Sequence, residues 1–331
     1  MGTHTVFFRN QPRILSTATI AGPKECAGVV GKYVDKGLQD DKFGESTFEK
    51  AECKMLTYAI EHAIENGGVE RDQVDALVLG DLLNQIISAS FAARDFNIPF
   101  LGVYGACSTL AEAIALGSTM IDSGYMNYVV AATGSHFSTA ERQYRYPLEL
   151  GCTRPPQSQW TVTGAGGVLL AKEGSPLAVT SATFGKVVDY GITDVNNMGA
   201  AMAPAARDTI LTHLKETNRS PDYYDLIVTG DLGALGSRIL KDLTWEKGVD
   251  IGKNHVDCGE IVYNVVEDEF QGGSGAGCSA VVFGSYLCHK LRHGGIRRML
   301  LAATGALLSP ISAAQGESIP CICHAVSVEV V

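Results

Sequence analysis

The stretch Gly105-Ala106-Cys107-Ser108 introduces the most hydrophobic part of the chain, and it has a counterpart later in the sequence, Ala276-Gly277-Cys278-Ser279. Each stretch is followed, at the same distance after its cysteine, by an Ala-Ala-Thr-Gly string: Ala131–Gly134 after the first and Ala302–Gly305 after the second. Equal spacing of matched strings indicates an internal duplication, which has to be recognised before a fold is assigned.

Two further pairs of segments recur in the same order. Ser16-Thr17-Ala18-Thr19 matches Thr180-Ser181-Ala182-Thr183, and Asp75–Leu82 matches Asp225–Leu232. The second pair consists of short apolar runs that end in Gly-Asp, as is typical of strands buried on both faces. Three matches in one order are hard to attribute to chance.

We therefore predict two homologous halves, residues 1–172 and 173–331. In the first half, the spacing of apolar residues over Phe48–Asn66 predicts a helix, and Ser108–Ser123 predicts a second, buried helix that leads to a strand at Tyr128–Thr133. Alternating strands and helices predict a layered α/β fold with mainly parallel sheets. Two such halves around a pseudo-twofold axis place both central helices in the core.

The composition of the 331 residues is that of a globular chain with a large core. Apolar residues make up 46% and charged residues 19%, below the usual share of about 25%. The formal net charge of −10 argues against nucleic-acid or anionic-membrane binding through net electrostatics, although a local basic patch remains open. No apolar run is long enough to span a membrane, and the first residues lack signal-peptide and myristoylation patterns. We expect neither a membrane span nor secretion nor acylation.

The nine cysteines include no C-x-x-C pair, so the sequence predicts reduced thiols rather than a disulfide framework or a zinc site. Cys107 is the most informative of them because it stands directly before a predicted helix. Free N–H groups and the helix dipole stabilise a thiolate there, so we expect a lowered pKa and a nucleophile or an anion site. The alternative is a small residue required by a crowded turn. A nucleophilic cysteine also requires a base, for which His136 is the best placed of the eight histidines.

Two aspartates, Asp81 and Asp231, end equivalent strands on the side where open α/β sheets bind ligands. Paired carboxylates serve as acid and base or hold a cation. The alternative is that each aspartate accepts hydrogen bonds from the free N–H groups of the helix that follows.

Two other motifs are set aside. Gly272–Ala280 contains a G-x-G-x-x-A match, but no acidic residue follows where a ribose would need one, so we exclude nicotinamide binding. His289 and His293 have the i, i+4 spacing of metal ligands without an obvious third ligand. We prefer the interpretation that they follow the preference of cationic side chains for helix C-termini.

Together these features resemble the thiolase superfamily: a duplicated α/β half, a cysteine before a buried central helix, and a Gly-rich turn at the matching place in the second half. More closely, several strings spread over essentially the whole chain resemble the family of stage V sporulation AD proteins of spore-forming bacteria: Ala21–Glu25, Gly80–Gln85, Gly105–Thr109, Ala203–Ala206 and Ala303–Pro310. The resemblance implies a five-layered αβαβα thiolase-like fold that binds dipicolinic acid, pyridine-2,6-dicarboxylate.

Departures from the enzymes of that superfamily favour binding over catalysis. Ketoacyl-synthase-type enzymes carry a histidine after the strand that corresponds to Asp225–Thr229, where this chain has Asp231. They carry a second His or Asn near the Gly-rich turn, where this chain has Ser274. The resemblance therefore implies a binding protein, and the alternative is an acyl-CoA condensing enzyme that uses Cys107.

The ligand-binding residues that we predict on this basis are Asp81, Asn84, Cys107, His136, Asp231 and Ser274. A free dicarboxylate would be repelled by two aspartates, whereas Ca²⁺ accepts oxygen ligands from both sides. We therefore expect the calcium chelate as the better ligand, with no further cofactor. Cys107 and helix-start N–H groups would receive a carboxylate, while His136 and Ser274 would hydrogen-bond the rest.

The resemblance also implies partners and a location. It implies the membrane complex that moves calcium dipicolinate into the forespore and out again at germination. Attachment to the spore inner membrane would come through the membrane subunits of this stage V sporulation A complex. The low charge content and the usual dimeric state of the superfamily both suggest a homodimer. No nucleic-acid partner is expected.

Overall fold

The computed structural model describes residues 3–144, 154–263 and 271–331. Its strands are β1 (Thr5–Phe7), β2 (Arg13–Ala21), β3 (Lys36–Gly37), β4 (Ala76–Gly80), β5 (Phe100–Gly102), β6 (Tyr128–Ser135), β7 (Trp160–Thr161), β8 (Gly164–Ala171), β9 (Leu177–Thr183), β10 (Leu226–Thr229), β11 (His255–Asp257), β12 (Gly273–Ser274), β13 (Arg298–Ala306) and β14 (Cys321–Val330). Its helices of five or more residues are α1 (Pro23–Ala27), α2 (Phe48–Asn66), α3 (Ile87–Arg94), α4 (Thr109–Asp122), α5 (Phe137–Tyr144), α6 (Met198–Thr217), α7 (Gly233–Trp245), α8 (Cys258–Val262), α9 (Ala276–Val282), the π-helix Phe283–Leu287, α10 (Cys288–Arg292) and α11 (Pro310–Ala314).

Twelve of these strands form one continuous sheet with the order β11-β10-β13-β14-β9-β2-β8-β6-β4-β5, to which β1 and β3 add at the side. The order β5-β4-β6-β8-β2 at one end is repeated by β11-β10-β13-β14-β9 at the other. In both, the first three strands run parallel and the fourth is antiparallel to its neighbours. The two sets meet where β2 pairs with β9, Arg13 opposite Ala178.

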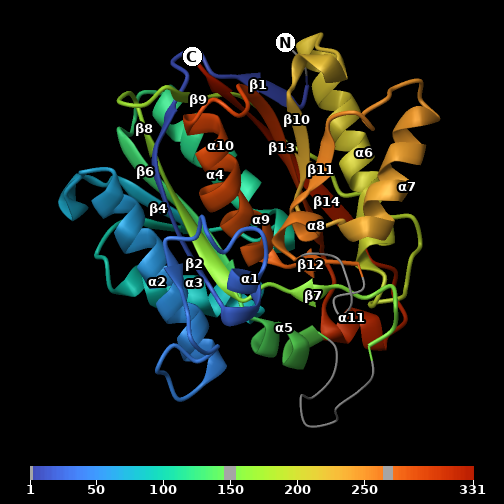
Figure 1. Ribbon diagram of the computed structural model, residues 1–331, viewed down its shortest axis with the longest axis horizontal. Coiled ribbons are helices and arrows are strands. Elements are labelled where there is room, and N and C mark those ends of the chain that lie inside the picture. Colours follow the sequence, from blue (N-terminus) through green and yellow to red (C-terminus); the bar gives the residue numbers. More distant parts are fainter. Residues whose placement is uncertain (1–2, 145–153, 264–270) are drawn as a thin grey trace.

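The two sets of five strands form two β layers, and the helices add one layer between them and one on each outer face (Figure 1). Helices α2 and α3 cover the outer face of the first five strands, and α6 and α7 cover the outer face of the second five. Helix α4 lies between the two sets and contacts β6 on one side and β14 on the other, with α9 beside it. The predicted αβαβα thiolase-like architecture is confirmed.

The local sequence explains where the central helices begin. Helix α2 starts after Thr47, whose side chain accepts a hydrogen bond from the Lys50 N–H, and its bounds are those predicted. Helix α4 starts at Thr109, because residues Ala106–Ser108 form a tighter 3₁₀ turn. The helix of the second half that corresponds to α4 is divided into α9 and α10 by the π-helix Phe283–Leu287.

Two sequence expectations concern the chain as a whole. Within the described ranges, every helix is either too short or too polar to span a bilayer. The eight cysteines in these ranges are free thiols, as predicted. Cys152 lies outside the described residues.

Candidate functional site

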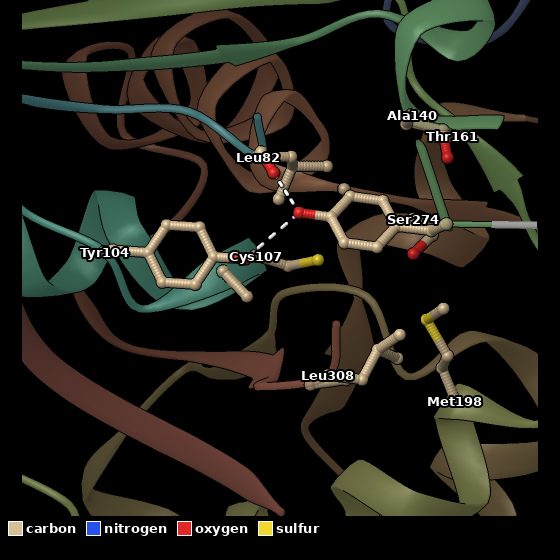
Figure 2. A pocket seen from close by; sticks show the side chains of 12 residues that line it. Leu82, Tyr104, Cys107, Ala140, Thr161, Met198, Ser274 and Leu308 are labelled. Carbon is tan, nitrogen blue, oxygen red and sulfur yellow. Dashed lines mark hydrogen bonds between the residues drawn. The ribbon is translucent and has the colours of Figure 1, made fainter. Parts of the chain in front are cut away.

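A small cavity with about 30 Å³ of free space opens beside Cys107 where the two halves meet. Figure 2 shows the Cys107 sulfur among the side chains that line it. The walls are mainly apolar, and the polar groups among them are hydroxyls and the thiol. The lining residues are Leu82, Tyr104, Ala106, Cys107, Ala140, Tyr144, Thr161, Met198, Ser274, Gly275, Ala306 and Leu308. No Lys, Arg or His is found among these described residues.

The turn that carries Cys107 is fixed by its own short side chains and by the second half of the chain. The Ser108 hydroxyl donates to the carbonyl of Gly105 at 2.7 Å, and the Thr109 hydroxyl donates to the carbonyl of Ala106 at 2.6 Å. Gly305 of β13 packs so closely that a Cβ there would lie 2.0 Å from the Gly105 carbonyl oxygen. Only glycine at 305 lets β13 support this turn.

Asp231 lies behind the cavity wall and organises the Gly-rich turn. Its Oδ2 accepts hydrogen bonds from the Ser274 hydroxyl and the Gly275 N–H, both at 3.0 Å, and its Oδ1 accepts one from the Thr304 hydroxyl at 2.9 Å. The side chain is fully buried, and this burial raises the pKa of Asp231 although the three donors and Cys107 oppose the shift. The carboxylate thus ties β12 to β13 next to the thiol.

The structure corrects the expected electrostatics of Cys107. Burial raises the pKa of the Cys107 thiol well above its ordinary value, and the neighbouring Asp231 carboxylate raises it further. The prediction of a lowered pKa is wrong because desolvation and a nearby negative charge outweigh the helix-start N–H groups. Cys107 is therefore a neutral thiol.

His136 follows β6, but its ring is turned away from Cys107. The Nε2–H group donates to the carbonyl of Asp41 at 2.7 Å, and Nδ1 accepts from the Ser138 N–H at 3.0 Å. The ring also packs against Phe48, with centroids 5.1 Å apart. Both nitrogens are thus occupied, and burial lowers the pKa of His136. The structure does not bring His136 into the cavity.

Asp81 takes the alternative role that the sequence left open. Its carboxylate accepts from the N–H groups of Leu83 and Ala89, both at 2.7 Å, and so holds the start of α3. Burial raises the pKa of Asp81 to about 6. The carboxylate does not line the cavity.

Asn84 is exposed on the loop that follows and lines a separate hollow of about 440 Å³. This hollow shares Tyr104, Tyr144 and Leu308 with the cavity. The structure therefore brings together three of the six predicted residues, Cys107, Asp231 and Ser274, and places Asn84 at a neighbouring hollow.

Sequence reasoning missed the two tyrosines at this boundary. The Tyr144 hydroxyl donates to the carbonyl of Leu82 and lies 3.1 Å from the Tyr104 hydroxyl (Figure 2). Tyr104 precedes the Cys107 turn, whereas Tyr144 ends α5. No periodicity or motif links these positions, so only the tertiary structure shows the pair.

The fold and the buried Cys107 turn define a thiolase-like protein. Solved structures with this fold match the chain from end to end. The 3-oxoacyl-[acyl-carrier-protein] synthase III of Aquifex aeolicus VF5 superimposes with a TM-score of 0.60 at 13% identity, covering 96% of this chain and 99% of that one. An OleA variant of Xanthomonas campestris superimposes with a TM-score of 0.62 at 14% identity, covering 98% and 99%.

Closer relatives identify the family. The family model of Stage V sporulation protein AD matches residues 2–329. The Stage V sporulation protein AD of Bacillus subtilis (strain 168) is 45% identical over 328 residues, which cover 99% of this chain and 97% of that protein. This chain belongs to the Stage V sporulation protein AD family.

Proposed function

We propose that this sporulation-family protein binds dipicolinic acid in the Cys107 cavity. The observation that carries the proposal is the cavity itself, a small space with apolar walls and a few neutral hydrogen-bonding groups. Apolar walls suit the flat faces of a pyridine ring. The Ser274 hydroxyl donates its proton to Asp231, so we propose that its oxygen contacts the cation of a calcium chelate and that the Cys107 thiol contacts the edge of the ligand.

The charge of the cavity favours the calcium chelate over the free dianion. The lining residues that the structure describes supply no Lys or Arg to neutralise two carboxylates, and Asp231 adds a buried acid directly behind Ser274. Bound Ca²⁺ removes the charge of the ligand and still accepts further oxygen ligands. We therefore propose that calcium strengthens binding.

We propose that Cys107 serves binding rather than catalysis. A thiol must be deprotonated to act as a nucleophile, and here burial and Asp231 raise its pKa. Both ring nitrogens of the nearest predicted base, His136, are engaged elsewhere. The second candidate is an acyl-CoA condensing enzyme, which the shared fold of the synthase and OleA structures supports. It requires a covalent acyl group on Cys107, which mass spectrometry after incubation with acyl-CoA would detect.

The proposed biological setting follows from the family. We propose that the protein is the ligand-binding subunit of the stage V sporulation A complex, which moves calcium dipicolinate into the forespore and out at germination. Its membrane subunits would hold it at the spore inner membrane.

We also propose a homodimer, because the edge strand β5 presents exposed Phe100 and Leu101 next to exposed Ile87 and Phe91. Unpaired apolar edge strands are ready templates for pairing with another chain.

Calorimetry of dipicolinate binding tests the proposal. The wild type is titrated with and without Ca²⁺ and compared with Cys107→Ala and Ser274→Ala. Cys53→Ala, which changes a half-buried cysteine on α2, is the matched control. We expect saturable binding that tightens with Ca²⁺, weakens at least about fivefold in the two cavity variants, as loss of a hydrogen bond implies, and is unchanged in the control. Absence of heat at millimolar ligand would refute the proposal.

A further inference from the structure

The segment His289–Arg298 is basic, whereas the chain as a whole is acidic. It contains Lys290, Arg292, Arg297 and Arg298 together with two histidines and no acidic residue, in a chain whose formal net charge is −10. It joins the end of α10 to the start of β13. His289, Arg292, His293 and Arg297 are exposed. We call this stretch the basic segment.

The four Lys and Arg side chains of the basic segment have no carboxylate partner. Within the described part of the chain, none of them takes part in an ion pair. Arg298 stacks on the ring of Tyr223, with 4.4 Å between the guanidinium carbon and the ring centroid. The guanidinium of Arg292 contacts the hydroxyl of Thr17 at 3.2 Å. Their charges are therefore available to an external anion.

The carboxylates that lie beside the basic segment are engaged in other contacts. Asp225 accepts from the backbone N–H groups of Arg297 and Arg298, at 2.7 and 2.9 Å. Glu329 pairs with Arg219 at 3.2 Å, and Asp35 accepts from both the N–H and the hydroxyl of Thr19. These acids stabilise the backbone or other side chains. Asp225 offsets part of the charge of Arg297 and Arg298, which lower its pKa, and the basic segment keeps an excess of positive charge.

Two polar hollows flank the basic segment. One, of about 380 Å³, is bordered by His289, Arg292 and His293 together with Tyr33 and Asp35. The other, of about 390 Å³, is bordered by Tyr223, Arg297, Arg298, Glu329 and Val330. Each hollow thus presents a cation beside an aromatic ring and one carboxylate, Asp35 or Glu329, which is already bound by other donors. The cation is the group that the carboxylate of an inserted side chain would meet.

The basic segment lies far from the Cys107 cavity. Strand β13 starts with Arg298 and ends with Ala306, which lines the cavity. At roughly 3.3 Å per residue, a strand of this length separates the two places by more than about 20 Å. In Figure 1, α10 lies near the end of the molecule that carries the C-terminus, whereas β7 and β12, which supply Thr161 and Ser274 to the cavity, lie farther from that end, below the centre of the view.

We propose that the basic segment is a docking surface for an acidic segment of a partner polypeptide. An anionic bilayer is a poorer fit, because its flat surface presents no side chains that enter the two discrete hollows. A peptide carrying spaced Asp and Glu side chains fills both hollows while its backbone crosses the exposed Arg297. Docking there leaves the Cys107 cavity open to its ligand.

A labelled decaglutamate peptide, measured by fluorescence anisotropy at low and physiological salt, tests this docking surface. The test variant is the double substitution Arg292→Gln and Arg297→Gln. The matched control is Lys247→Gln with Lys253→Gln, which changes the net charge equally at two exposed lysines that have no ion pair among the described residues. We expect binding to weaken roughly tenfold in the test variant and less than about twofold in the control.

Hydrogen exchange locates the bound peptide independently of affinity. Protection of the amides of residues 286–299, without protection around residues 104–107, supports the inference. Equal weakening in both double variants, or protection elsewhere, overturns it. A second arm uses vesicles with phosphatidylglycerol: stronger retention on vesicles than on the peptide, lost in the test variant alone, would assign the segment to lipid and also overturn the inference. Dipicolinate affinity, measured in parallel, is expected to stay unchanged, so the two proposals fail separately.

Discussion

The hydroxyl of Ser274 donates a 3.0 Å hydrogen bond to the carboxylate of Asp231, and the pair lies directly beside the thiol of Cys107. A negative charge next to a buried thiol keeps that thiol protonated. The polar groups that line the cavity are hydroxyls and this thiol, and no positively charged side chain lines it among the described residues. The chemistry of the site therefore depends on Asp231, although Asp231 does not line the cavity.

Replacing Asp231 tests this dependence. In Asp231→Asn, removal of the charge lowers the pKa of Cys107, and a fall of about one unit raises the thiolate fraction roughly tenfold at mildly alkaline pH. We expect faster alkylation of Cys107 by iodoacetamide, followed by peptide mass spectrometry. The half-buried Cys53 in the same molecule serves as the internal control. Faster alkylation of both cysteines would indicate loosening of the fold instead, and an unchanged rate at Cys107 would contradict the prediction.

Asp81 offers the contrasting case of a buried aspartate that supports the fold. In Asp81→Asn, one of the two acceptor oxygens becomes an NH₂ group that faces the N–H of Leu83 or Ala89. We expect the free energy of unfolding to fall by about 1–3 kcal/mol because a buried donor loses its acceptor. Dipicolinate affinity should stay within about twofold of the wild type, since the carboxylate lies outside the cavity lining. Abolished binding in a folded variant would restore Asp81 as a ligand-binding residue.

The buried Glu25 carboxyl group should make the free energy of unfolding depend on pH. It is fully buried, accepts from the Tyr263 hydroxyl and from the Thr163 N–H, and burial raises its pKa from 4.5 to about 7. The folded state therefore holds a proton that the unfolded state releases, so stability falls as the pH rises through this window. Glu25→Gln mimics the protonated form at every pH. Relative to wild type, its free energy of unfolding should rise by up to roughly 3 kcal/mol between about pH 5 and pH 8.

Urea denaturation of Glu25→Gln and wild type at the two pH values measures this difference. Glu317→Gln, at an exposed glutamate, is the matched control and should show the same pH dependence as the wild type. A difference between Glu25→Gln and wild type that does not change with pH would show that Glu25 is ionised in the folded state.

The proposed dimer predicts a clear change in mass. Strand β5 pairs only with β4 among the described strands, and Leu101 on it is 38% exposed. Leu101→Glu puts a charge into the proposed contact. Light scattering should give about twice the 35.1 kDa chain mass for the wild type and a single chain mass for the variant. Tyr125→Glu, at a side chain that is 89% exposed on another loop, should remain dimeric. A monomeric wild type would refute the dimer.

Helices and turns whose ends are set by residues close in the sequence were predictable from it. The helix Phe48–Asn66 has the predicted bounds because its cap, its apolar spacing and its Gly stop are all local. Cys107 was correctly placed on a tight turn before a central helix for the same reason. The role of Asp81 was one of the two that the sequence offered, because its partners Leu83 and Ala89 are close in sequence. The role of His136 was not accessible, because its ring binds the carbonyl of Asp41, which is distant in sequence.

The sequence by itself determined the duplicated α/β plan, since repeats and apolar periodicity record which residues each element must bury. Only the tertiary structure decided the chemistry of the site. Cys107, Asp231 and Ser274 are far apart along the chain and meet only because the two halves pack around α4. The sign of the Cys107 pKa shift follows from that packing: a helix start is a local property, whereas desolvation and the charge of Asp231 exist only once the chain has folded.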